Sequence, residues 1–151
     1  MMYRLAGSGL QYAAENLALV ERHFLNEGLN RLDLVVADYT DDILWDAPAR
    51  GLHVVGKDAV RDIYSRMFPN MRNATFETLA RFPLETPVPT EGQVLDYSIA
   101  RFQLAGEGFL QLPVGTYVEM ELSHIFGFRR HNGIPKIAAE IIYEKWRPLE
   151  K

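Results

Sequence analysis

The stretch VEMELSHIFGFRR, Val118 to Arg130, holds a histidine where an apolar residue is expected. In an extended chain alternate residues share a face, so His124 lies on the same face as Leu122 and Phe126. Histidine titrates near neutral pH and can act as an acid or a base. Apolar neighbours would lower its pKa by desolvation unless a carboxylate is close. We interpret His124 as a catalytic or pocket residue. The alternative is a structural histidine bonded to a backbone carbonyl or to water.

Glu140 is a first candidate partner for His124, in the stretch KIAAEIIYEK. If Ala138, Glu140 and Ile142 face the interior, this carboxylate lies in an apolar setting that raises its pKa and suits acid–base catalysis. The turn sequence HNGIP makes the two segments neighbours in a hairpin, so Glu140 could approach His124. The alternative is an exposed or interface glutamate.

Asp46, in LWDAP, is a second candidate catalytic carboxylate. It could act as a base at the mouth of a pocket. The alternative is a turn-forming aspartate just before Pro48.

Several further side chains could line a pocket. Tyr12, Asn16 and His23 share one flank of a predicted helix, which could instead be a solvated or interface flank. For Trp45 a packing role is favoured over a stacking platform for a ligand. The expected pocket residues are Tyr12, Asn16, His23, Trp45, Tyr64, Met67, Phe68, Met120, Leu122, Phe126 and Ile142.

Composition narrows the classes of function. The 151 residues carry a net charge of −4 without a cluster of basic residues, which argues against a nucleic-acid partner. No cysteine is present, and the four histidines form no metal-binding pattern, so we expect no metal site. No G-x-G-x-x-G or P-loop occurs, so we expect no cofactor. No signal peptide or membrane-length apolar run is seen, so we expect a cytoplasmic protein without a membrane partner.

Helices are predicted in the first half of the chain. A capping box at Ser8 begins a helix that ends at Gly28, and Asn30 caps a second, short one. The segment 40–48 is a predicted strand, and 49–58 a loop. A third helix covers residues 57–68 and stops at Pro69.

Strands are predicted in the second half, over residues 74–82, 93–104, 109–130 and 136–146. The third of these is expected to be broken near Pro113 and Gly115. Helices followed by antiparallel strands indicate a single α+β domain over residues 1–151, in which about three N-terminal helices close a curved sheet into a cone.

The chain from Gln11 to Trp146 resembles the nuclear transport factor 2-like superfamily, and within it the SnoaL-like polyketide cyclases and the ketosteroid isomerases. The resemblance is carried by VVADYTDDILWDAP, GKDAVRDIYSRMF and VEMELSHIFGFRRHNGIPKIAAEIIYEKW. It implies a homodimer whose interface includes the outward face of the last strands. The expected interface residues are Glu119, Glu121, Ser123, Ile125 and Tyr143.

The resemblance also implies roles for particular positions. The cyclases have a pocket histidine where this chain has His124, and the isomerases have an oxyanion donor there. The general-base aspartate of the cyclases corresponds to Ile142, two residues after Glu140, and that of the isomerases to Ala47, next to Asp46. The isomerases' tyrosine donor falls near His23. No known catalytic set is therefore complete.

Three functions follow from the sequence. The first is a cofactor-free enzyme that moves a proton next to a carbonyl in a small apolar or polycyclic molecule, giving cyclisation, isomerisation or dehydration. The others are a small-molecule binding module without catalysis and a dimeric scaffold with a filled cone. Two or more ionisable groups converging on a cavity would favour the enzyme.

Overall fold

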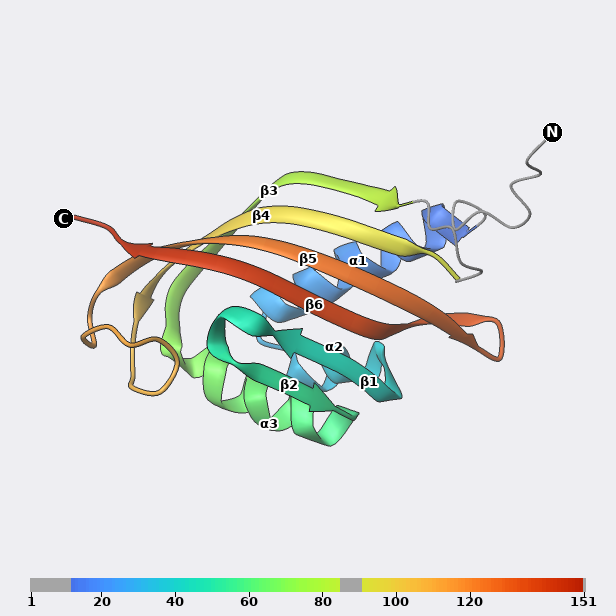
Figure 1. The fold of residues 1–151 in the computed structure, drawn as a ribbon, viewed down its shortest axis with the longest axis horizontal. Coiled ribbons are helices and arrows are strands. Elements are labelled where there is room, and N and C mark those ends of the chain that lie inside the picture. Colours follow the sequence, from blue (N-terminus) through green and yellow to red (C-terminus); the bar gives the residue numbers. More distant parts are fainter. Residues whose placement is uncertain (1–11, 85–90, 151) are drawn as a thin grey trace.

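The computed structural model describes residues 12–84 and 91–150. Three helices lie against one face of a curved six-stranded sheet (Figure 1). The helices are α1 (Ala13–Gly28), α2 (Leu32–Ala37) and α3 (Lys57–Met67). The strands are β1 (Tyr39–Ala47), β2 (Leu52–Val55), β3 (Met71–Leu84), β4 (Gln93–Leu104), β5 (Tyr117–His131) and β6 (Ile134–Pro148). The α+β architecture expected from the sequence is confirmed.

The order of strands in the sheet is β2-β1-β6-β5-β4-β3. All neighbours are antiparallel except β1 and β6, which run parallel. The pairing of β1 with β6 brings the N-terminal half of the chain beside its C-terminal strand. Residues that are far apart in sequence therefore share one interior surface.

The concave face of the sheet and the helices enclose the apolar core. Along β4 the burial alternates strictly, with every second residue from Val94 to Leu104 buried. Such alternation is typical of a strand with one face on the core. β6 departs from it, because Phe128 pairs with Ile137 while Gly127 pairs with Ala139. Ala138 is thus an extra residue, and this irregularity lets both Ile137 and Glu140 face inward.

Several local predictions were wrong. β2 forms inside the predicted loop, because its four residues pair with β1. Asn30 does not cap α2. It has φ 53°, and the residue before the helix is Arg31. Residues 109–116 form no strand, because Pro113 and Gly115, the latter at φ 93°, turn the chain before β5. The predicted capping residue Ser8 lies outside the described residues.

The β5–β6 hairpin is as expected. Asn132 and Gly133 both have positive φ, 52° and 77°, which is the backbone of a type I′ turn. No helix in residues 12–84 and 91–150 is both long and apolar enough to cross a membrane.

Candidate functional site

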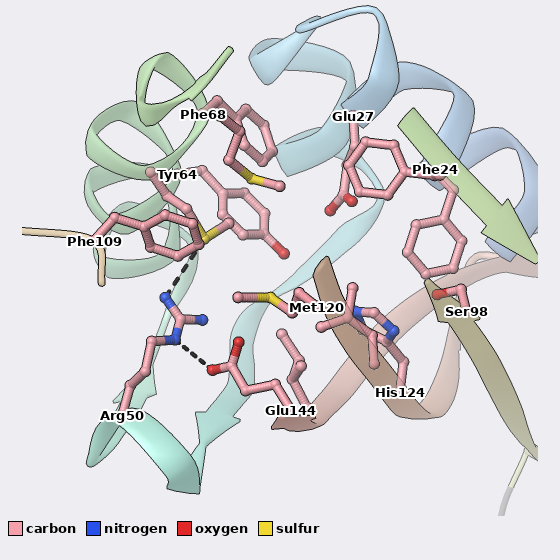
Figure 2. Close-up of a pocket in the computed structure, with 15 residues that line it drawn as sticks. Phe24, Glu27, Arg50, Tyr64, Phe68, Ser98, Phe109, Met120, His124 and Glu144 are labelled. Atoms are coloured by element: carbon pink, nitrogen blue, oxygen red, sulfur yellow. Dashed lines mark hydrogen bonds and ion pairs between the residues drawn. The ribbon is translucent and has the colours of Figure 1, made fainter. Parts of the chain in front are cut away.

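A cavity, here called the central cavity, lies between the helices and the concave face of the sheet (Figure 2). The space between its side chains measures about 510 Å³, part of it open to solvent, but the centre of a water-sized sphere can move within only about 50 Å³. The small space open to such a sphere shows that the cavity is narrow as it stands. Three of its walls are the flexible side chains of Met67, Met71 and Met120, which can adjust to an occupant.

The walls of the central cavity are mostly apolar, with a few polar side chains among them. The polar ones are Glu27, Arg50, Tyr64, Ser98, His124 and Glu144. They come from α1, the short 3₁₀ turn Pro48–Arg50, α3, β4, β5 and β6. Apolar walls with a few converging polar groups are typical of small-molecule sites.

His124 lies on the wall formed by β5 and is only 5% exposed. Its ring is stacked against Phe126, with centroids 5.6 Å apart, and meets the edge of Phe24 at 5.0 Å. Its Nδ1 is 3.9 Å from Oδ1 of the buried Asp96, beyond hydrogen-bond distance, and Asp96 itself is paired with Arg81. Burial lowers the pKa of His124 to about 4, against the opposing effect of nearby carboxylates. The imidazole is therefore neutral at neutral pH, and can donate one hydrogen bond and accept another.

A second histidine, His23, lies on α1 behind the cavity wall and is fully buried. Its Nδ1 is 3.2 Å from Asp38 Oδ2, and its Nε2 is 3.3 Å from Glu27 Oε1. Burial alone would lower the pKa of His23, but the hydrogen bonds with Asp38 and Glu27 raise it to about 10. Arg22 also pairs with Asp38 at 2.6 Å. His23 is therefore a buried imidazolium held between two carboxylates.

The hydroxyl of Tyr39 connects the buried polar groups. It donates to Glu140 Oε2 at 2.5 Å and lies 3.1 Å from His23 Nε2 and 2.8 Å from the Tyr64 hydroxyl. Tyr64 also accepts a bond from Trp45 Nε1 at 3.1 Å. Burial raises the pKa of both tyrosines well above the usual value, so both keep their protons. Tyr64 also lines the central cavity, so the network extends to the cavity wall.

Glu140 is fully buried within this network. Burial raises the pKa of its carboxyl to about 7, although the nearby His23 acts in the opposite direction. A carboxyl group with this pKa can hold or release a proton near neutral pH.

The structure brings together about half of the predicted site residues. Those that line the central cavity are His124, Tyr64, Met67, Phe68, Met120, Leu122 and Ile142. Four others are buried behind its lining: His23, Trp45, Phe126 and Glu140. Glu140 also has other partners than expected. It pairs across the hairpin with Phe126, and its hydrogen bonds go to Tyr39 and Tyr64 rather than to His124.

Three predicted residues lie away from the cavity. Asp46 faces outward on β1, 3.5 Å from the exposed His53, because no bulge reverses the alternation next to Trp45. Tyr12 stacks under Arg130, whose guanidinium is 3.5 Å from the ring centre. Asn16 is buried and donates to the backbone oxygen of Glu91 at 2.9 Å.

Sequence reasoning missed the carboxylate that reaches the cavity from α1, Glu27, and the carboxylate behind His23, Asp38. The signal for Glu27 was its position four residues after His23, which places both on one side of a helix. Asp38 follows α2 directly, and no local pattern marks it, because its contact with His23 depends on how the helices pack.

Metal-ligand atoms of His23, Glu27 and Glu140 lie within 4.8 Å of one another, the one such group in residues 12–84 and 91–150. The Tyr39 hydroxyl, however, already bonds to His23 and Glu140. The arrangement is thus a connected hydrogen-bond network in which protons link these groups.

No family model and no curated relative matches the chain. Solved structures do. Hexachlorocyclohexane dehydrochlorinase LinA-type3 from Novosphingobium barchaimii LL02 has 12% sequence identity and a TM-score of 0.73, with 90% of this chain and 88% of that one covered. The epoxide hydrolase/cyclase-like enzyme SalBIII has 16% identity, a TM-score of 0.63, and coverage of 85% and 88%. An NTF2-like protein of unknown function from Cytophaga hutchinsonii has 20% identity, a TM-score of 0.60, and coverage of 87% and 98%.

These similarities show that the chain has the nuclear transport factor 2-like fold, as the resemblance in its sequence implied. The fold hosts several chemistries among these neighbours and does not select one for this chain.

Proposed function

We propose that the chain is an acid–base enzyme that removes a proton next to a carbonyl group in a small, largely apolar molecule. The observation that carries the proposal is the convergence of Glu27, His124 and Tyr64 on one apolar cavity (Figure 2). A carboxylate and two hydrogen-bond donors are the groups needed to take a proton from carbon and to stabilise the enolate oxygen.

Each group has a role that follows from its surroundings. Glu27 takes the proton, because it is the carboxylate of the buried network that reaches the cavity. Neutral His124 donates to the oxygen. Protonated Tyr64 also donates to it, by turning its single O–H from Glu140 toward the ligand. His23, held by Asp38, fixes a positive charge beside Glu27 and orients that carboxylate. The proton gained by Glu27 can pass to the network around Glu140.

The test is the exchange of the C2 protons of 1-indanone for deuterium, followed by NMR in deuterated buffer. The expected result is an exchange rate with the protein well above that in buffer. Glu27→Gln should lower the added rate by roughly a hundred- to ten-thousand-fold. Glu21→Gln, at an exposed position on the same helix as Glu27, is the matched control and should leave it unchanged. Equal rates for the wild type and Glu27→Gln would contradict the assignment of the base.

A non-catalytic binding module is the second candidate. It is favoured by the hydrogen bonds that His23, Tyr39 and Glu140 make with one another, which leave these groups satisfied without a ligand. Saturable binding of 1-indanone with no exchange above buffer would support this alternative.

We further propose a homodimer in the cytoplasm, with no nucleic-acid or membrane partner. The proposed interface is the outward face of β5 and β6, where Tyr143 is 53% exposed and pairs across the hairpin with Ser123. Tyr143→Lys should shift the molar mass in light scattering from that of a dimer to that of a monomer. A monomeric wild type would refute the proposal.

A further inference from the structure

Arg50 brings a cation into the wall of the central cavity, separate from the groups assigned to the chemistry. Its side chain is 12% exposed and its guanidinium lies 5.6 Å from the centre of the Trp45 ring and 5.2 Å from that of Phe109. Nε donates to Glu144 Oε1 at 2.5 Å and Nη1 to Met67 Sδ at 3.5 Å. Nη2 has no partner among the described residues, and Figure 2 shows it turned toward the interior.

Glu144 offers an acceptor beside this donor. Its side chain is 1% exposed, and its only hydrogen bond within the described residues uses Oε1. Oε2 points into the cavity, as Figure 2 shows. The two side chains come from different elements, Arg50 from the turn after β1 and Glu144 from β6, so the tertiary fold holds the pair together.

A free donor next to a free acceptor fits a group that can both accept and donate. A hydroxyl group does this, since its oxygen accepts from Arg50 and its proton goes to Glu144. A carboxylate would fit poorly, because the charge of Arg50 is already balanced and Glu144 would repel it. An ether can accept but not donate.

We propose that Arg50 and Glu144 form a subsite for a hydroxyl group, and that the molecule taken up by the cavity is a hydroxylated ring compound. The inference deepens the proposed function and rests on it in assuming that a ligand enters the central cavity. The subsite selects for a neutral, polar group of the ligand. This group lies at a different place on the ligand from the reacting carbonyl.

The test is calorimetric binding of four matched probes, slightly below neutral pH so that a phenol stays protonated. They are 1-indanone and its 5-hydroxy, 5-methoxy and 5-carboxylate derivatives. The 5-hydroxy compound should bind the wild type at least about tenfold more tightly than each of the other three, since hydrogen bonds to charged groups are worth that much or more. Glu144→Gln should reverse the order of hydroxy and carboxylate, because Arg50 then lacks its counter-charge.

Glu21→Gln is the control variant and should keep the wild-type order. Equal binding of the hydroxy and parent compounds to the wild type would overturn the inference. So would tighter binding of the carboxylate, or binding of none of the four. The wild-type comparison decides the matter even if Glu144→Gln does not fold. In Glu27→Gln the hydroxyl preference should persist while exchange is lost, so failure of the subsite and failure of the proposed chemistry are distinguishable.

Discussion

Replacing His124 by glutamine should remove most of the pH dependence that this histidine gives to the free energy of unfolding. The folded protein holds the pKa of His124 at about 4, against 6.5 for an unperturbed histidine. The unfolded chain therefore binds this proton more readily, and acid favours unfolding. The stability associated with neutral His124 is fully present above pH 6.5 and is lost as pH falls toward 4. One pKa unit corresponds to about 1.4 kcal/mol, so the loss approaches about 3 kcal/mol at pH 4 and is about 2 kcal/mol at pH 5.

The assay is urea unfolding of the wild type and His124→Gln at neutral pH and near pH 5. Other titrating groups are common to both proteins, so the difference between their changes isolates His124. Between neutral pH and pH 5, the free energy of unfolding should fall by about 2 kcal/mol more for the wild type than for the variant. His131→Gln, at the exposed end of the same strand, controls for the replacement of an imidazole. If His124→Gln shows the same loss as the wild type, the argument that burial keeps His124 neutral is refuted.

Three further outcomes are expected. The stability contributed by His23, whose pKa is raised to about 10, is present below pH 6.5 and should fall as pH rises toward 10. In urea unfolding, the free energy of unfolding of His23→Asn should fall less than that of the wild type as pH rises toward 10. Tyr39→Phe removes the hydroxyl that bonds His23, Tyr64 and Glu140, and should lower the free energy of unfolding by about 1–3 kcal/mol. Asp46→Asn should leave indanone exchange within about twofold of the wild type, because Asp46 faces outward; a larger decrease would show that our placement of it is wrong.

The elements with strong periodicity were predictable from the sequence, and those that depend on distant pairing were not. The predicted strand 93–104 has the same bounds as β4. The local pattern of apolar and polar residues is enough to set its alternation. β2 has only four residues and exists because β1 lies beside it. No local signal separates such a segment from a loop.

The same distinction applies to the site. His124 faces inward because it follows the period of β5, which could be read directly. Glu140 also faces inward. Because Ala138 is an extra residue in β6, Ile137 faces inward as well, which a regular alternation would not allow. The partners of Glu140 come from β1 and α3, so their approach is a property of the tertiary fold. Sequence pattern could identify candidate groups and their faces, but not which of them would meet.

The two buried histidines show how neighbours decide the chemistry available in one interior. His124 meets the rings of Phe24 and Phe126 and stays neutral, while His23 lies between Asp38 and Glu27 and stays charged. Their pKa values, about 4 and about 10, lie on opposite sides of neutrality. Neither histidine changes its charge near neutral pH, so one acts as a hydrogen-bonding group and the other as a fixed cation. In the proposed reaction the proton then moves through a carboxyl group. Glu27 is the carboxylate that both contacts His23 and lines the cavity.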